Sequence, residues 1–109
     1  MMYLYCETLG RENLTPQVFK DLSSAKSHLF WDYLEVTGID DDEVINYAKH
    51  GRFEEAYRWL LDNDLIDDEN DINLDDNNLS AYCETYNDDK WSARVFKLET
   101  TEPNISIKP

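Results

Sequence analysis

The chain repeats a short sequence pattern at an offset of 77 residues. The tetrapeptide Tyr-Cys-Glu-Thr begins at Tyr5 and again at Tyr82, and the tripeptide Val-Phe-Lys begins thirteen residues after each of them. Seven of sixteen aligned positions are identical between the two copies. Each copy has two stretches of strand-forming residues with turn-forming residues between them. The repeat therefore predicts one β-hairpin used twice, over residues 2–22 and 78–99.

Helices are expected between the two hairpins, because apolar residues recur there at helical spacing. Their expected ranges are residues 24–37, 41–50 and 52–63. Ser23 or Ser24 is expected to cap the first helix, and Asp40 the second. Gly38 and Gly51 follow the first and second helices and predict their ends.

These elements predict a single α+β domain over residues 1–109. We expect the two hairpins to form one antiparallel four-stranded sheet, with about three helices inserted between them. An acidic loop is expected at residues 64–77 and an extended tail, which contains two Pro residues, at 100–109. The N-terminus has neither a basic start nor a long apolar run, so the expected location is the cytoplasm. Two Cys residues then predict free thiols, with a disulfide as the alternative.

The strand register of the two hairpins predicts which side chains share a face. We expect Tyr5 to pair with Val18, and Tyr82 with Val95. The face expected against the helices contains Leu4, Cys6, Phe19, Leu79, Ala81, Cys83, Phe96 and Leu98. The outer face is expected to contain Tyr3, Tyr5, Glu7, Val18, Lys20, Tyr82, Glu84, Tyr86, Trp91, Val95 and Lys97. This outer face has three interpretations: cross-strand packing with Glu–Lys pairs, an aromatic surface for a partner, or the interface of a homodimer.

Acidic residues outnumber basic ones by 24 to 10, which gives a net charge of −14. Eight acidic residues lie within the fifteen residues 62–76, and no Lys or Arg occurs between Trp59 and Asp89. This charge disfavours direct binding to nucleic acids and to anionic membranes. It is consistent either with plain solubility or with a basic protein partner. Rows of carboxylates can also imitate the phosphate spacing of duplex DNA, which favours a partner that normally binds nucleic acid.

The expected partner-binding residues are the carboxylates of the acidic run and three aromatic residues of the sheet. They are Asp62, Asp64, Asp67, Asp68, Glu69, Asp71, Asp75, Asp76, Tyr5, Tyr82 and Trp91. No catalytic residue, metal ligand or cofactor is predicted. His28 and His50 have no metal-ligand spacing, and a calcium-loop register beginning at Asn73 lacks the starting Asp and the central Gly.

The sequence Tyr-Ala-Lys-His-Gly-Arg-Phe-Glu-Glu-Ala-Tyr-Arg-Trp, residues 47–59, resembles the turn of a tetratricopeptide unit. In that unit the Gly permits the turn, the aromatic residue packs between the helices, and the Ala allows close approach. The resemblance covers residues 41–63 and implies an antiparallel helix pair. It occurs once, whereas tetratricopeptide arrays need about three repeats to bury their cores, so no peptide-binding function is inferred.

In size, acidity and aromatic content the whole chain resembles phage-encoded counter-defence proteins, such as anti-restriction and anti-CRISPR inhibitors. It is similar in the same respects to the immunity proteins of nuclease toxins. The resemblance implies a small non-enzymatic inhibitor of a positively charged, nucleic-acid-handling protein, acting in the host cytoplasm. An acidic adaptor module and a calcium-responsive domain are the alternatives.

Overall fold

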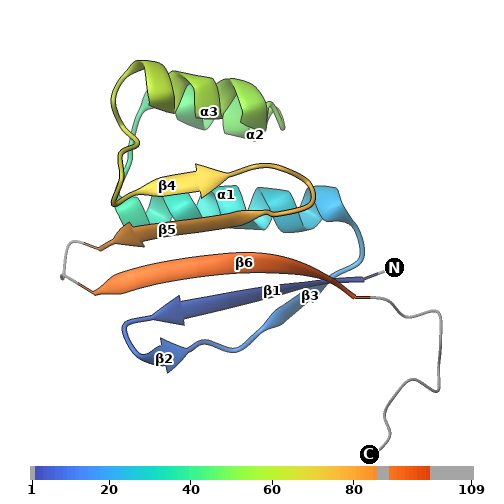
Figure 1. The fold of residues 1–109 in the computed structure, drawn as a ribbon. Coiled ribbons are helices and arrows are strands. Elements are labelled where there is room, and N and C mark those ends of the chain that lie inside the picture. The colour runs from blue at the N-terminus through green and yellow to red at the C-terminus, as the bar shows by residue number, and fades with distance from the viewer. Residues whose placement is uncertain (1, 86–88, 99–109) are drawn as a thin grey trace, which may run out of the picture.

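The computed structural model describes residues 2–85 and 89–98, which form an α+β fold with three helices and one antiparallel sheet (Figure 1). The predicted class and the three helices are therefore confirmed. In chain order the elements are β1 (Met2–Leu9), β2 (Glu12–Asn13), β3 (Gln17–Phe19), α1 (Leu22–Thr37), α2 (Asp42–Lys49), α3 (Phe53–Asp62), β4 (Asp71–Asn73), β5 (Ser80–Glu84) and β6 (Lys90–Leu98). The expected tail at 100–109 and Tyr86 lie outside the described residues.

The first two helices begin at carboxylate caps that differ from the expected residues. Asp21 caps α1 by accepting a hydrogen bond from the Ser24 backbone N–H at 2.7 Å, so the expectation of Ser23 or Ser24 is wrong. Asp41 caps α2, one residue after the expected Asp40. In both helices the extended backbone at the cap aims a carboxylate at the free N–H groups of the first turn.

The two glycines expected to end helices have the backbone conformation that this role requires. Gly38 has φ 76° and Gly51 has φ 72°, in the left-handed region where a Cβ atom is strained. After Gly51 the chain turns into α3, whose Phe53 is buried with its ring centroid 5.3 Å from that of Phe30 in α1. This ring contact ties the α2–α3 pair to the rest of the core.

The sheet has the strand order β2-β1-β6-β5-β4, and β3 also pairs with β1. The expectation of four strands is wrong for two reasons. The expected acidic loop contains the short strand β4, and the strand that should return after β1 is split into β2 and β3.

The split in the returning strand is a bulge. Tyr5 pairs with Gln17 and Thr8 with Asn13, so the two residues of β1 between these pairs lie opposite three residues of the returning chain. Pro16 lies in this interval and has no N–H for the ladder. The bulge changes the register that the repeat had suggested.

Both expected registers are wrong by an odd number of residues. Tyr5 pairs with Gln17 instead of Val18, and Tyr82 pairs with Ser92 instead of Val95. An odd shift moves a strand's side chains to the other face. Accordingly β3 and β5 have the expected orientation, while β1 and β6 have the opposite one. The residues that lie on the face opposite to the predicted one are Tyr3, Leu4, Tyr5, Cys6, Glu7, Trp91, Val95, Phe96, Lys97 and Leu98.

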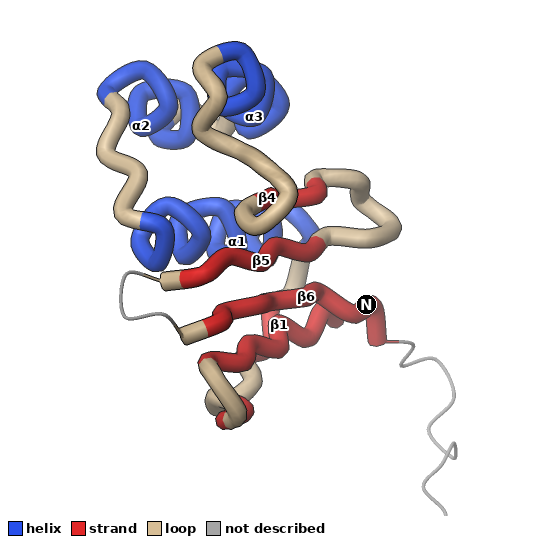
Figure 2. Tube along the Cα trace, turned by 60° about the vertical axis from the view of Figure 1, so that its left-hand side comes forward, coloured by secondary structure: helices blue, strands red, loops and turns tan. Residues whose placement is uncertain are grey.

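Helix α1 covers one face of the sheet. Figures 1 and 2 show α1 lying across β5, with α2 and α3 beyond the β4 edge. The core between the layers contains Tyr5, Leu29, Phe30, Tyr33, Phe53, Leu60, Ile72, Leu79 and Trp91, among others. Within the described residues no helix covers the other face, which we call the open face. It presents Met2, Leu4, Cys6, Thr8, Val18, Ser80, Tyr82, Glu84, Lys90, Ser92, Arg94, Phe96 and Leu98.

Candidate functional site

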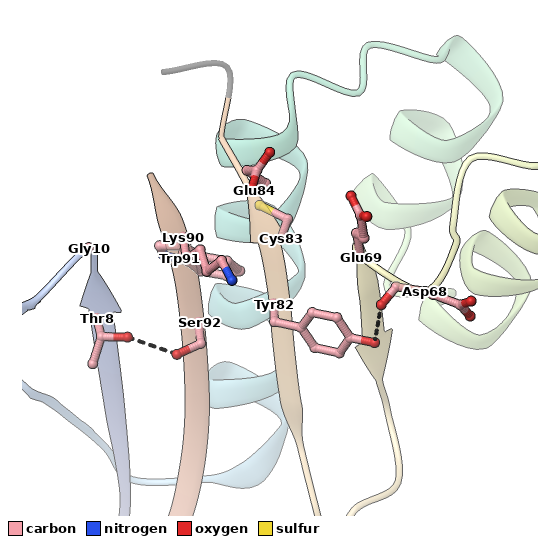
Figure 3. A pocket seen from close by; sticks show the side chains of 10 residues that line it. All are labelled: Thr8, Gly10, Asp68, Glu69, Tyr82, Cys83, Glu84, Lys90, Trp91 and Ser92. Atoms are coloured by element: carbon pink, nitrogen blue, oxygen red, sulfur yellow. Dashed lines mark hydrogen bonds between the residues drawn. The ribbon is translucent and has the colours of Figure 1, made fainter. Parts of the chain in front are cut away.

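A groove of about 600 Å³ lies on the open face (Figure 3). Its walls come from the ends of β1, β5 and β6 and from Asp68 and Glu69 of the segment before β4. The groove therefore brings part of the acidic run to the sheet. Of the expected partner-binding residues it contains Asp68, Glu69, Tyr82 and Trp91.

Tyr82 spans the groove from the sheet to the acidic run. Its side chain is 45% exposed, and its hydroxyl donates a hydrogen bond to the backbone oxygen of Asp68 at 3.2 Å. Figure 3 shows the ring extending from β5 toward that oxygen. Beside it, the hydroxyls of Thr8 and Ser92 are hydrogen-bonded at 2.8 Å across β1 and β6. The groove thus combines an exposed aromatic ring with neutral polar groups.

Two oppositely charged residues of the groove were not among the expected site residues. Glu84 and Lys90 lie directly opposite each other on β5 and β6, at the end of the strands that the groove occupies. The alternation of Ser80, Tyr82 and Glu84 along β5 is the sequence signal that places Glu84 on the same face as Tyr82.

Charge is divided between two parts of the molecule. Residues 40–76, which we call the acidic lobe, contain fourteen acidic and three basic side chains, and twelve of the fourteen are exposed. Residues 2–20 and 90–98, which we call the cationic strands, contain two acidic and five basic side chains. Most of the net charge therefore belongs to α2, α3 and the chain around β4.

Four of the eight carboxylates in the acidic run have structural partners. Asp76 Oδ1 lies 2.8 Å from Lys26 Nζ of α1. Asp67 and Asp75 accept hydrogen bonds from the backbone N–H groups two residues later, at 2.8 and 2.9 Å. Asp71 accepts one from the Ile72 N–H at 2.7 Å. Its charge, together with burial, raises the pKa of Tyr57, with burial the larger cause.

The other four carboxylates, those of Asp62, Asp64, Asp68 and Glu69, make no side-chain hydrogen bond or ion pair within residues 2–85 and 89–98. All four residues are exposed. Asp64 has φ 55° at the turn that ends α3, a conformation that Asp, Asn and Gly adopt most readily. This set is the part of the acidic run that remains available to a partner.

Tyr5 and Trp91 are buried, at 1% and 2% exposure, although the expected register placed them on the outer face. The Trp91 indole N–H donates to Glu7 Oε2 at 2.8 Å on the helix side of the sheet. Trp91 lines the groove although it is buried, and Tyr5 does not line it.

Tyr5 belongs instead to a half-buried cluster with Asp32 and His28 of α1. The Tyr5 hydroxyl donates to Asp32 Oδ2 at 2.7 Å, and His28 Nε2 lies 3.3 Å from the same oxygen. The His28 ring packs between the rings of Tyr5 and Phe19, at centroid distances of 4.6 and 5.1 Å. Burial, and then the contact with Asp32, raise the pKa of Tyr5, so its phenol remains a hydrogen-bond donor. The cluster fastens β1 and β3 to α1.

The two Cys residues are free thiols in the structure. Cys6 is half-buried on the open face, whereas Cys83 is buried on the helix face. Burial raises the pKa of the Cys83 thiol. The equivalent positions of the repeated tetrapeptide therefore have different surroundings.

Within the described part of the chain, no group of three or more His, Cys, Asp or Glu side chains has the arrangement of a metal site. No helix in the same residues has the length and apolar character needed to cross a membrane. Searches of protein-family models, curated proteins and solved structures find no match to this chain.

Proposed function

We propose that this protein is a small, non-enzymatic inhibitor that binds a positively charged, nucleic-acid-handling protein. It acts in the host cytoplasm as anti-CRISPR and anti-restriction proteins do, by offering carboxylates where the target expects phosphates. The observation that carries the proposal is the concentration of exposed charge in the acidic lobe, with fourteen acidic and three basic side chains.

The groove adds a local contact site to the charge of the acidic lobe. Asp68 and Glu69 have carboxylates without a partner among the described residues, and they lie beside the exposed ring of Tyr82. Carboxylates steer a basic surface toward the protein, and an exposed Tyr supplies contact area once the two have met. Such a site favours the Lys- and Arg-rich cleft of a nuclease over nucleic acid itself, which the same charge repels.

The test is a panel of DNA-cleavage assays with purified Cas nucleases, restriction enzymes and nuclease toxins. We expect one class to be inhibited stoichiometrically, with an affinity that falls at least about tenfold between about 50 and 200 mM salt. Inhibition of a toxin alone would assign the protein as an immunity protein. If no enzyme of the panel is bound or inhibited at low salt, the proposal is wrong.

A matched pair of variants tests which carboxylates are used. The double variant Asp68→Asn/Glu69→Gln removes two charges at the groove, and we expect it to weaken inhibition about tenfold or more. The control Glu12→Gln/Glu35→Gln removes two charges from exposed residues outside the acidic lobe, so it changes the net charge equally. Equal effects of the two variants would contradict a localised site.

A further inference from the structure

The groove on the open face combines an exposed aromatic ring with an excess of negative charge. Three of its lining side chains are acidic and one, that of Lys90, is basic. The ring of Tyr82 is 45% exposed, and Figure 3 shows it between β5 and the segment of Asp68 and Glu69. The face of an aromatic ring attracts a cation, and carboxylates beside it attract the same charge. The groove therefore suits a cationic side chain of a partner.

The hydroxyl of Tyr82 is already occupied by the protein itself. It donates a hydrogen bond to the backbone oxygen of Asp68 at 3.2 Å, which joins the far end of the ring to the acidic run. What Tyr82 offers to a partner is therefore the surface of its ring. Any cation on that surface lies close to the segment that contains Asp68 and Glu69.

Asp68 and Glu69 form the tip of a tight turn between Asp67 and Asn70. The backbone N–H groups of Asp67 and Asn70 each donate to the other residue's carbonyl oxygen, at 2.9 and 3.3 Å. Asn70 Oδ1 also accepts a hydrogen bond from the hydroxyl of Tyr33, which is buried in the core. The turn is thus held in place before a partner arrives, so binding requires little ordering of its backbone.

A flat ring beside carboxylates favours Arg over Lys. The guanidinium group of Arg is planar, stacks on aromatic rings and donates two parallel N–H groups to one carboxylate. The ammonium group of Lys is compact and strongly hydrated, so it gains less from the ring. A guanidinium stacked on Tyr82 directs its N–H groups outward in its own plane, where the turn offers the carboxylates of Asp68 and Glu69. Neither carboxylate has a side-chain partner within residues 2–85 and 89–98.

We propose that the groove binds one arginine side chain of the basic partner, with the guanidinium stacked on the Tyr82 ring and hydrogen-bonded to Asp68 or Glu69. The class of partner rests on the function proposed above. The inference adds the chemical group that is recognised, and it makes Tyr82 the residue that distinguishes Arg from Lys.

NMR titrations of the full chain at low salt test the site without a partner protein. The probes are the peptide acetyl-Gly-Arg-Gly-amide and its Lys analogue. We expect the largest amide shifts at Asp68, Glu69 and Tyr82, and a dissociation constant at least about threefold lower for the Arg peptide. Tyr82→Phe keeps the ring and should keep this preference, whereas Tyr82→Ala should remove it.

The matched control is Phe96→Ala. Phe96 is also 45% exposed and lies on the open face, but it does not line the groove. We expect this variant to change either dissociation constant by less than about twofold. Thermal unfolding of each variant verifies that the variant is folded.

The Arg and Lys peptides binding equally well to the wild-type chain would overturn the proposal, as would no binding of the Arg peptide up to about 50 mM. A preference for Arg that survives in Tyr82→Ala also overturns it, and so do shifts in α2 and α3 as large as those at the groove. None of these results affects inhibition of a nuclease, which the enzyme panel measures separately. Selective binding of the Arg peptide by a protein that inhibits no enzyme of the panel would refute the proposed function and leave the groove as an arginine site.

Discussion

The Tyr5 hydroxyl donates a hydrogen bond to Asp32 Oδ2 at 2.7 Å, which joins the inner strand β1 to α1. The equivalent residue of the repeated tetrapeptide, Tyr82, lies on the opposite face of the sheet and is half exposed. The Tyr of the repeated tetrapeptide is thus a buried core residue in the first copy and an exposed surface residue in the second.

This difference predicts unequal effects of the same substitution. Tyr5→Ala should lower the free energy of unfolding by about 3–5 kcal/mol, because it leaves a cavity and an unpaired Asp32. Tyr82→Ala should lower it by less than about 1 kcal/mol. Urea unfolding measures both. If Tyr5→Ala does not fold, Tyr5→Phe should still cost about 1–2 kcal/mol. Equal losses at the two positions would contradict the register.

Stability should fall in alkaline solution. Burial is the main cause that raises the pKa of Tyr5 and of Tyr33 above their ordinary value of 10.0. The unfolded chain therefore loses these protons first as the pH rises above about 10, and proton loss favours unfolding. The stabilisation is complete below that pH and is lost progressively above it. Thermal melts from pH 8 to 11 should show the decline, and Tyr5→Phe should reduce its slope.

The two thiols should differ in reactivity. Cys6 is half-buried on the open face, whereas Cys83 is buried and its pKa is raised by burial. A chromogenic disulfide reagent at neutral pH should therefore modify the Cys6 thiol quickly, and the Cys83 thiol only when the chain unfolds. Cys6→Ser should abolish the fast phase, and Cys83→Ser should leave it intact. Two fast thiols in the native protein would contradict this assignment.

Neutralising acidic residues should have opposite effects at paired and unpaired positions. Asp76 forms an ion pair with Lys26, so Asp76→Asn should lower the free energy of unfolding by about 0.5–1 kcal/mol. Asp68→Asn removes repulsion within the acidic lobe and should leave stability unchanged or raise it by a few tenths of a kcal/mol. Urea unfolding at low salt measures both changes. A stability loss in Asp68→Asn as large as that in Asp76→Asn would contradict the pairing described here.

The helices were predictable because their signals are local. Gly38 and Gly51 lie where a left-handed residue must end a helix, and apolar residues recur at helical spacing before each of them. The predicted capping residues are one to three positions away from the observed ones, because several Asp and Ser residues near each helix start could act as the cap. Both observed caps are Asp, because its carboxylate is a strong acceptor for the N–H groups of the first turn.

The sheet was less predictable because its register depends on distant contacts. The repeat suggested two equivalent hairpins, but the bulge near Pro16 and the pairing of β1 with β6 decide the faces of Tyr5 and Phe96. The sequence did not predict β4, because the strand has one buried side chain, Ile72, and lies within a run of acidic residues. As a result the groove contains the expected Asp68, Glu69 and Tyr82, whereas Tyr5 could be assigned to the core only from the structure.

The pairing of β1 with β6 has a consequence for the order in which the protein folds. Glu7 and Trp91, which are hydrogen-bonded, are 84 positions apart, and the two inner strands come from the beginning and the end of the described chain. Contacts this distant in sequence form late, whereas the helix pair needs only neighbouring residues. During synthesis, β1 and β5 thus present unpaired edges until the ribosome has released the last strand.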